Sequence, residues 1–311
     1  MDTTGHEQHT GEAGQRVALV TGGTAGIGRA VAVRLARGGD RVLFTGRDSA
    51  RGAEVVEALQ RVGPDANHMF LPADLSLLAN TAQLADAVAQ QTNRVDAVVF
   101  CAGVLSLVPE WTSEGLERSF VINYLTRYLL ARRLVPALRR APHGRLVLVA
   151  NAGTYRDSLD FEDLQHRRGK AGIAVAGRTQ FANDLLAVEL ASRLRGTQVE
   201  VTCVYPGVVA TDVFRNARGL PWIMRALAQL VQRLVAIPPD AAAHTPADLA
   251  QDPEAVAAGG RFYGPGMKVR DIPARALRPG RRNALWEASE DLVRPYLPVD
   301  SHALRAVGQV T

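Results

Sequence analysis

The sequence predicts an α/β fold built on a doubly wound parallel sheet within a single domain. Short apolar runs alternate with helical patterns from residue 16 to residue 205, which is typical of parallel strands covered by helices on both faces. A glycine-rich turn joins the first run to the first helical pattern. The chain of 311 residues, 47% of them hydrophobic, is long enough to bury one large core.

The elements follow one another in regular alternation. The first strand ends at the glycine-rich turn, and Gly38-Gly39-Asp40 stops the helix after it. Each later strand is a short apolar run, and each helix has apolar residues at helical spacing. The predicted strands span 16–21, 41–45, 68–72, 95–101, 144–149 and 199–205, and the predicted helices span 26–37, 50–61, 77–91, 115–138 and 174–194.

Composition and charge argue against several classes of protein. Residues 1–14 are polar, so we expect a disordered tail rather than a signal peptide, followed by one domain over 15–311. No uninterrupted apolar run is long enough for a membrane span. The net charge of +5 comes from scattered arginines without interleaved aromatics, which argues against a nucleic-acid partner. Cys101 and Cys203 lie in strand patterns, so we expect reduced thiols in a cytoplasmic protein without a metal site.

The turn Thr21-Gly-Gly-Thr-Ala-Gly-Ile-Gly28 lies between the first predicted strand and helix. Glycines allow a tight turn and a close approach of the backbone to a pyrophosphate, and the amino end of the helix adds positive potential. The turn therefore predicts a nucleotide site, with packing without a ligand as the alternative. The residues expected at the cofactor are Gly22, Thr24, Gly26, Ile27 and Gly28.

The residue after the second predicted strand bears on the choice of cofactor. An acidic residue there would accept hydrogen bonds from the adenosine ribose and favour NAD. The chain has Arg47 at this point. A guanidinium accepts no hydrogen bond but pairs with a 2′-phosphate, so the sequence favours NADP.

The Thr-Gly-x-x-x-Gly-x-Gly spacing resembles that of the short-chain dehydrogenases/reductases, and other segments resemble their retinol-dehydrogenase-like branch, over roughly residues 16–295. The resemblance implies a Rossmann-type fold, a lipophilic small-molecule substrate and a homodimer or homotetramer formed through the two long helices. Capping of the next helix is an alternative role for Asp74. The resemblance also implies cofactor contacts for Asp74, Leu75, Ala102, Gly103, Pro206, Gly207 and Thr211.

Three positions depart from the family pattern. Where the family has a serine, a tyrosine and a lysine that together move a proton, this chain has Asn151, Ala176 and Gln180. Alanine has no proton to give, and glutamine has no charge with which to lower a neighbouring pKa, although Gln180 can still hydrogen-bond ribose hydroxyls. Tyr155 and Lys170 are fifteen residues apart, so they do not rebuild a motif that needs i, i+4 spacing.

Two classes of function follow from this replacement. In the first, which we favour, the protein is a tailoring enzyme of secondary metabolism that binds NADP(H) and catalyses isomerisation, cyclisation, elimination or an unusual hydride transfer. In the second, it is a pseudoenzyme that acts as a nucleotide-binding or scaffold protein. An NADP-dependent oxidoreductase of ordinary mechanism is a further alternative. The candidates for orienting a substrate are Asn151, Asn123, Tyr155, Tyr205 and Arg178.

The pattern changes between about residues 214 and 250. Because this segment follows a strand of the cofactor site, we interpret it first as a lid over the substrate. A helix packed on its own domain is the second interpretation. A helix on a membrane surface, with Arg225 and Arg233 at its margins, is the third. All three use an apolar stripe formed by Ile223, Leu227, Leu230, Val231 and Leu234.

Overall fold

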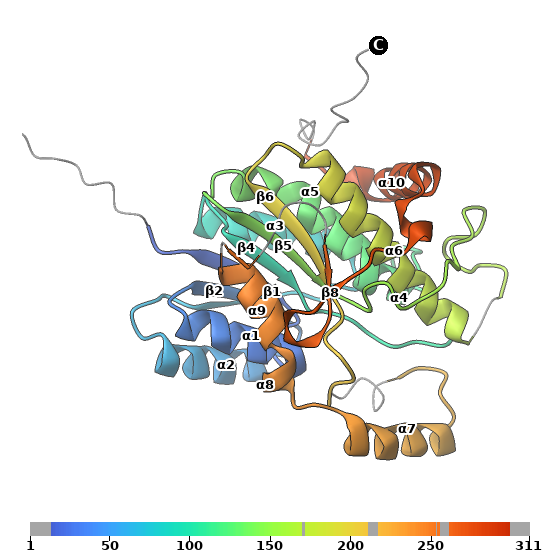
Figure 1. Ribbon diagram of the computed structural model, residues 1–311, viewed down its shortest axis with the longest axis horizontal. Helices are drawn as coiled ribbons and strands as arrows, with labels where there is room; N and C mark the ends of the chain where they lie inside the picture. Colours follow the sequence, from blue (N-terminus) through green and yellow to red (C-terminus); the bar gives the residue numbers. More distant parts are fainter. Residues whose placement is uncertain (1–13, 170–171, 211–216, 253, 256–260, 299–311) are drawn as a thin grey trace, which may run out of the picture.

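One sheet with helices on both faces forms the molecule (Figure 1). The computed structural model describes residues 14–169, 172–210, 217–252, 254–255 and 261–298. The strand order is β3-β2-β1-β4-β5-β6-β7-β8; the pairs from β3 to β7 are parallel, and β8 runs antiparallel to β7. This arrangement confirms the predicted doubly wound α/β fold in a single domain. The strands are β1 (Val17–Thr21), β2 (Arg41–Gly46), β3 (Met69–Pro72), β4 (Ala97–Phe100), β5 (Gly144–Val149), β6 (Val199–Val204), β7 (Phe262–Tyr263) and β8 (Val269–Arg270).

The sheet separates two apolar cores. Successive residues of a strand point to opposite faces, so Ala18 and Val20 of β1 join one core while Val17 and Leu19 join the other. Burial on both faces explains why the central strands are continuous apolar runs. Helices α1 (Gly26–Arg37), α2 (Ser49–Val62) and α9 (His244–Gln251) pack on one face, and α3 (Leu78–Gln91), α5 (Thr126–Leu138), α6 (Ile173–Arg193) and α10 (Pro279–Val293) pack on the other.

The order of the strands determines where a ligand can bind. From β1 the chain winds outward to β2 and β3, then returns to place β4 on the other side of β1. In open sheets of this kind, ligands bind outside the carboxyl ends of the strands at the point where the winding reverses. That point is the end of β1 and β4, next to the glycine-rich turn predicted from the sequence.

The predicted long helix over 115–138 is divided in the structure. It begins after Glu117, whose carboxylate accepts hydrogen bonds from the backbone N–H groups of Ser119 and Phe120 and so caps the first turn. A short α4 (Arg118–Phe120) is followed by a π-helical segment, η1 (Val121–Leu125), and then by α5. The sequence pattern did not reveal that the helix starts after Glu117, because a glutamate is usually exposed on the protein surface.

The predicted lid over 214–250 also needs correction. The segment contains α7 (Trp222–Val235), α8 (Pro239–Ala242) and α9. Ala247, Leu249 and Ala250 of α9 are buried in the core beside α1, so the last part of the segment belongs to the body of the domain. Only α7 stands away from the body (Figure 1).

Several predictions fall on residues outside the described ranges. Residues 1–13 of the predicted tail lie outside the described residues, as do Lys170, Thr211 and positions 214–216. Within the ranges the structure describes, no helix has both the length and the apolar character needed to cross a bilayer. The strands β7 and β8, two residues each, are too short to be recognised by their sequence pattern.

Candidate functional site

The glycine-rich turn is folded so tightly that side chains would not fit. Gly22 has a φ of 68°, and a Cβ atom on it would lie 2.9 Å from the backbone of Ala102 at the end of β4. A Cβ atom on Gly28 would lie 2.2 Å from the carbonyl oxygen of Gly22. No side chain caps the start of α1, and its first turn has no acidic residue, so its N–H groups can receive an anion.

The end of β2 presents a cation beside this turn. Gly46 lies against Thr24, since a Cβ atom on Gly46 would be 2.6 Å from the Thr24 hydroxyl oxygen. Arg47 is exposed, and no hydrogen bond or ion pair engages its guanidinium within the described part of the chain. The next residue, Asp48, caps α2 by accepting a hydrogen bond from the N–H of Arg51. The Arg47 guanidinium is therefore available to an anionic ligand.

Asp74 does not cap the helix that follows it. Its carboxylate accepts a hydrogen bond from the N–H of Ser76 at 3.0 Å, which closes a turn after β3. The first N–H groups of α3 instead donate to Glu114, at 2.7 Å from Leu78. Leu75 is buried in the core, so only its backbone can lie at a ligand. The alternative interpretation, in which Asp74 caps the next helix, is therefore wrong. The Asp74 side chain remains partly exposed at the edge of the site.

A buried arginine ties the ends of β4 and β5 together. The Arg127 guanidinium donates to the carbonyl oxygens of Ala102 at 3.1 Å and Val149 at 2.9 Å. Burial lowers the pKa of Arg127 to about 10 and raises the pKa of Cys101 to about 12. Thr21 adds a third link, since its hydroxyl accepts a hydrogen bond from the N–H of Ala102. These contacts hold the Ala102-Gly103 segment beside the glycine-rich turn.

The structure brings Asn151 and Gln180 together. The backbone N–H of Asn151, just after β5, donates to the side-chain oxygen of Gln180 on α6 at 3.1 Å. The Asn151 side chain makes no hydrogen bond within the described residues, so its amide is free. Ala176 lies one helical turn before Gln180 and is buried. This face of α6 therefore offers an amide and a methyl group to a ligand, and no ionisable group at these two positions.

Tyr155 lies beside the position of Ala176. A Cβ atom on Gly177, the next residue of α6, would lie 3.0 Å from the ring of Tyr155. Burial raises the pKa of Tyr155, and the nearby Tyr205 raises it further. Arg270 of β8 stacks on the ring of Tyr205 at 5.1 Å. The structure thus gathers the two predicted tyrosines at the site.

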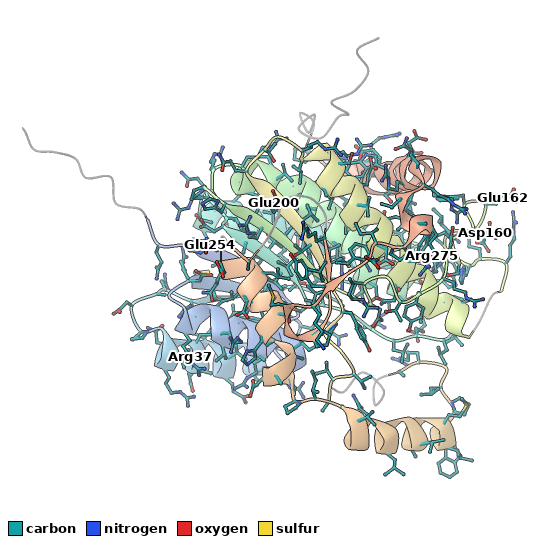
Figure 2. All side chains as sticks on the ribbon, in the orientation of Figure 1. Arg37, Asp160, Glu162, Glu200, Glu254 and Arg275 are labelled. Carbon is teal, nitrogen blue, oxygen red and sulfur yellow. The ribbon has the colours of Figure 1, made fainter. Side chains whose placement is uncertain are left out.

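A buried carboxyl holds the loop that bears Asn151 and Tyr155. Asp184, one turn after Gln180 on α6, accepts a hydrogen bond from the N–H of Gly153 with both oxygens at 3.1 Å. Burial raises the pKa of Asp184 to about 7. Arg275, labelled in Figure 2, donates to the carbonyl oxygens of Gly153 and Tyr155. The loop is clamped between α6 and the segment before α10.

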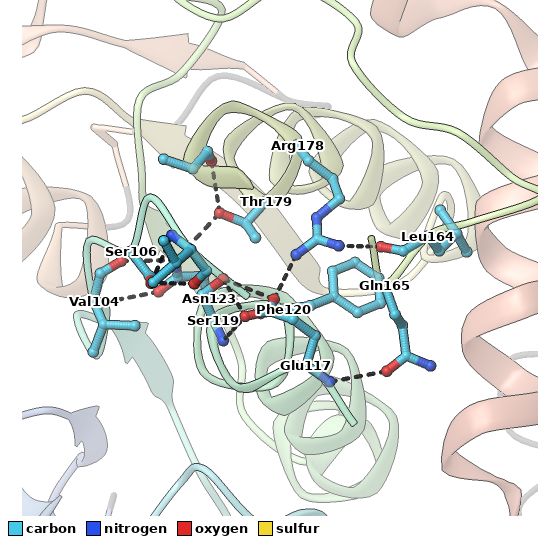
Figure 3. A network of polar contacts seen from close by, with 12 residues as sticks. Val104, Ser106, Glu117, Ser119, Phe120, Asn123, Leu164, Gln165, Arg178 and Thr179 are labelled. Carbon is cyan, nitrogen blue, oxygen red and sulfur yellow. Dashed lines mark hydrogen bonds and ion pairs between the residues drawn. The ribbon is translucent and has the colours of Figure 1, made fainter. Parts of the chain in front are cut away.

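Arg178 does not face this site. Its side chain is fully buried, and its guanidinium pairs with the carboxylate of Glu117 and donates to the carbonyl oxygen of Leu164 (Figure 3). The guanidinium also lies over the ring of Phe120 at 5.0 Å. These partners occupy the groups that would orient a substrate, so the predicted substrate-orienting role is corrected to a structural one.

Asn123 likewise braces the site from behind. Its side-chain oxygen accepts from the N–H of Val104 at 2.8 Å, and its amide nitrogen donates to the carbonyl of Val104 and to the hydroxyl of Thr179 (Figure 3). Its backbone carbonyl accepts a hydrogen bond from Asn183. Because these bonds engage the side chain on both ends, Asn123 positions the strand end after β4 and does not reach a substrate.

The last predicted motif follows β6. Pro206 is buried, and Gly207 has a φ of 90°, a conformation that favours glycine. A Cβ atom on Gly207 would lie 3.3 Å from the ring of Pro265. Thr211, which the sequence also placed at the cofactor, lies outside the described residues.

The chain is similar in sequence to known proteins. A family model described as short chain dehydrogenase matches residues 16–161. Mouse retinol dehydrogenase 14 is 31% identical over 288 residues, which cover 89% of this chain and 86% of that protein. The chain belongs to the short-chain dehydrogenase family. Mouse polyprenol dehydrogenase is a second similar member, 36% identical over 254 residues that cover 79% of this chain and 75% of the relative.

Solved structures agree with the fold. A crystal structure of a protein from Mycobacterium paratuberculosis has a TM-score of 0.68 and 24% identity, covering 90% of this chain and 94% of its own. A metagenomic short-chain oxidoreductase in complex with NADP has a TM-score of 0.57 and 27% identity, covering 77% and 92%. Members of this family bind nicotinamide cofactors, which agrees with the tight turn between β1 and α1.

Several residues of this short-chain dehydrogenase site escaped sequence reasoning. Glu114, Arg127, Asp184 and Arg275 each bond to the backbone of a distant segment. Charged residues within apolar helical stretches, as Arg127 and Asp184 are, give one signal, because such residues are almost never fully buried without a partner. The sequence does not say which partner they have.

Proposed function

We propose that this short-chain dehydrogenase binds NADP(H) and acts on a lipophilic small molecule without the family's tyrosine–lysine proton transfer. The cradle of Gly22, Gly28 and Gly46 fits a dinucleotide, because a Cβ atom at any of these positions would lie within 3.0 Å of a neighbouring atom. The free Arg47 guanidinium fits a 2′-phosphate. Gln180 and Asn151 would meet the nicotinamide end.

One observation carries the proposal. The face of α6 that lies against the Asn151 segment has Ala176 and Gln180 at i and i+4. A methyl group gives no proton, and a neutral amide does not stabilise a phenolate or any other anion as a cation would. Positioned acid–base groups supply about a hundred- to ten-thousand-fold in rate, so carbonyl reduction should be slow by comparison.

Tyr155 does not replace the missing acid. An acid–base tyrosine needs a pKa brought down toward the working pH by a neighbouring cation. Burial and Tyr205 move the pKa of Tyr155 in the opposite direction. Its hydroxyl can therefore donate a hydrogen bond to a substrate oxygen, but it does not release its proton readily.

The remaining groups can bind and orient. The free Asn151 amide can donate to a substrate oxygen, and the Gln180 amide nitrogen can donate to ribose hydroxyls, since only its oxygen is engaged by the loop. A bound nicotinamide would supply a hydride donor or acceptor. With these residues the site is suited to isomerisation, cyclisation, elimination or a hydride transfer that needs no carbonyl protonation.

The proposed substrate class rests on the similar proteins. Retinol and polyprenol, which appear in the names of the two relatives, are lipophilic alcohols. We extend this to a lipophilic ligand for the present chain, processed in a tailoring step of secondary metabolism by a homodimer or homotetramer.

The placement of Arg178 and Asn123 favours a second candidate function. Both were expected to orient a substrate, and both are engaged in the interior. Without these two side chains the site has fewer polar groups that could act on a substrate. This supports a nucleotide-binding or scaffold protein without turnover.

The proposal is tested by NADPH oxidation in the presence of retinal or an aromatic aldehyde. We expect the protein to bind NADPH, measured by quenching of its own fluorescence, and to oxidise it at a rate near the protein-free background. Tyr155→Phe and Tyr205→Phe serve as matched variants. Rapid oxidation that either variant abolishes would contradict the proposal, because it would identify that tyrosine as the acid.

A further inference from the structure

Helix α7 presents its apolar side to solvent. Trp222 is 78% exposed, and Ile223, Leu227 and Leu230 are 62%, 59% and 55% exposed. In Figure 2, side chains of α7 project from the side of the helix that faces away from the rest of the chain. Single exposed apolar residues are common on protein surfaces, but a continuous row of large ones marks an interaction site.

The polar side of α7 faces the body of the protein. Gln232 is buried, and its amide nitrogen donates to the carbonyl oxygen of Val209 at 2.6 Å. At about 100° per residue, Gln232 lies roughly 170° around the helix from the centre of Ile223, Leu227 and Leu230. A helix that packs on its own domain turns its apolar stripe inward. This helix is turned the other way, so the interpretation of α7 as a helix packed through that stripe is wrong.

The segment around α7 is rooted next to the candidate site. Val209 and Ile237 form a parallel bridge, and the N–H of Ile237 donates to the carbonyl of Val208 at 2.9 Å. Before α7 the chain is also held to the body at Arg218, whose N–H donates to the carbonyl of Leu105 at 3.1 Å and whose carbonyl accepts from the N–H of Leu107 at 2.9 Å. These two attachments, before and after α7, hold the segment to the body while the apolar row of the helix stays directed outward.

The positive charge of α7 indicates which kind of partner its apolar row would contact. Helix α7 contains two arginines, Arg225 and Arg233, and no carboxylate, within a chain of net charge +5. Arg218, which precedes the helix, is paired with Glu110 at 3.5 Å. A symmetric contact between two copies through α7 would bring like charges together without an acid from the helix to pair with them. Anionic lipid headgroups have the complementary charge, and arginines near such a surface are attracted to it.

We propose that α7 docks on the surface of an anionic lipid bilayer, with Ile223, Leu227 and Leu230 in the boundary between headgroups and acyl chains. A helix with an apolar row, an aromatic residue at one end and basic residues around it has the properties of such interfacial helices. The helix lies along the surface and does not cross the bilayer. Docking would bring the end of β6, and the mouth of the site beside it, to the lipid.

Sedimentation with vesicles tests this proposal on the full chain. We expect the protein to sediment with vesicles of phosphatidylcholine and phosphatidylglycerol, to bind pure phosphatidylcholine vesicles less, and to be released by high salt. The triple variant Ile223→Glu/Leu227→Glu/Leu230→Glu should bind at least about tenfold more weakly. Val269→Glu, at a site on β8 that is 59% exposed, serves as the control and should bind as the parent does.

Two results would overturn the proposal. One is equal sedimentation of the parent and the triple variant while circular dichroism shows both to be folded. The other is an absence of binding of the parent to the anionic vesicles. If the molar mass in analytical ultracentrifugation then falls from parent to triple variant, the apolar row belongs to a contact with a second copy of the chain.

Discussion

Replacing Asp184 with asparagine should make the stability of the protein less dependent on pH. Asp184 is fully buried, and burial raises the pKa of its carboxyl from 3.8 to about 7. Between these two values the folded protein holds a proton that the unfolded chain has released. The stabilisation associated with this proton is complete below pH 3.8 and is lost as the pH rises through about 7.

The size of the effect follows from the difference between the two pKa values. It corresponds to roughly 4 kcal/mol in all, at about 1.4 kcal/mol for each pH unit. Between pH 5 and pH 8 the parent should lose roughly 2–3 kcal/mol relative to Asp184→Asn. Asparagine is a suitable replacement because it stays neutral and its side-chain oxygen can still accept the hydrogen bond from Gly153.

Urea unfolding at several pH values measures this difference. The free energy of unfolding of the parent should fall relative to that of Asp184→Asn as the pH rises. Asp65→Asn, in the exposed turn before β3, is the matched control and should follow the parent throughout. Parallel curves for the parent and Asp184→Asn would refute the reasoning, since Asp184 would then be ionised in the folded protein over the whole range.

Two further predictions concern the cation at the cofactor site and the buried ion pair of Arg178 and Glu117. Arg47→Ala should weaken NADPH binding by the free energy of a charge-assisted contact, about 1–3 kcal/mol, and leave NADH binding unchanged. Arg51→Ala is the control. Equal affinity of the parent for both cofactors would contradict the role of Arg47 at the 2′-phosphate. Arg178→Met should destabilise the protein by about 3–5 kcal/mol in urea unfolding, because it leaves the buried Glu117 carboxylate without its cation. The double variant Arg178→Met/Glu117→Gln should recover part of that loss, and a single-variant loss below about 1 kcal/mol would argue against the buried pair.

The sequence was sufficient for strands β1 to β6 and for the glycine-rich turn. Strands buried on both faces are continuous apolar runs, as β1 and β5 are, and the turn before α1 requires glycines wherever two backbones meet closely. Local patterns of this kind depend on neighbouring residues, so they can be recognised without the fold.

The roles of polar side chains could not be predicted in the same way. Arg178 occupies a position on α6 that suits a ligand, and only the position of Glu117, which is 61 residues away in sequence, turns it into an interior ion pair. Asn123 and Asp184 depend likewise on loops that reach them from other elements. Helix α7 shows the same limit, because its stripe was visible in the sequence but its outward direction was not.

The central claim is that the nucleotide half of the site is retained while the acid–base half is replaced, and restoring the family residues tests it most directly. The measurement is the rate of NADPH-dependent aldehyde reduction by the parent and by Asn151→Ser/Ala176→Tyr/Gln180→Lys, with NADPH binding followed in both. We expect both proteins to bind NADPH, the parent to show no reduction above background, and the variant a feeble rate, because a tyrosine at the buried Ala176 position costs about 1–3 kcal/mol in strain. A parent that already reduces aldehydes as fast as the variant, or faster, would contradict the claim.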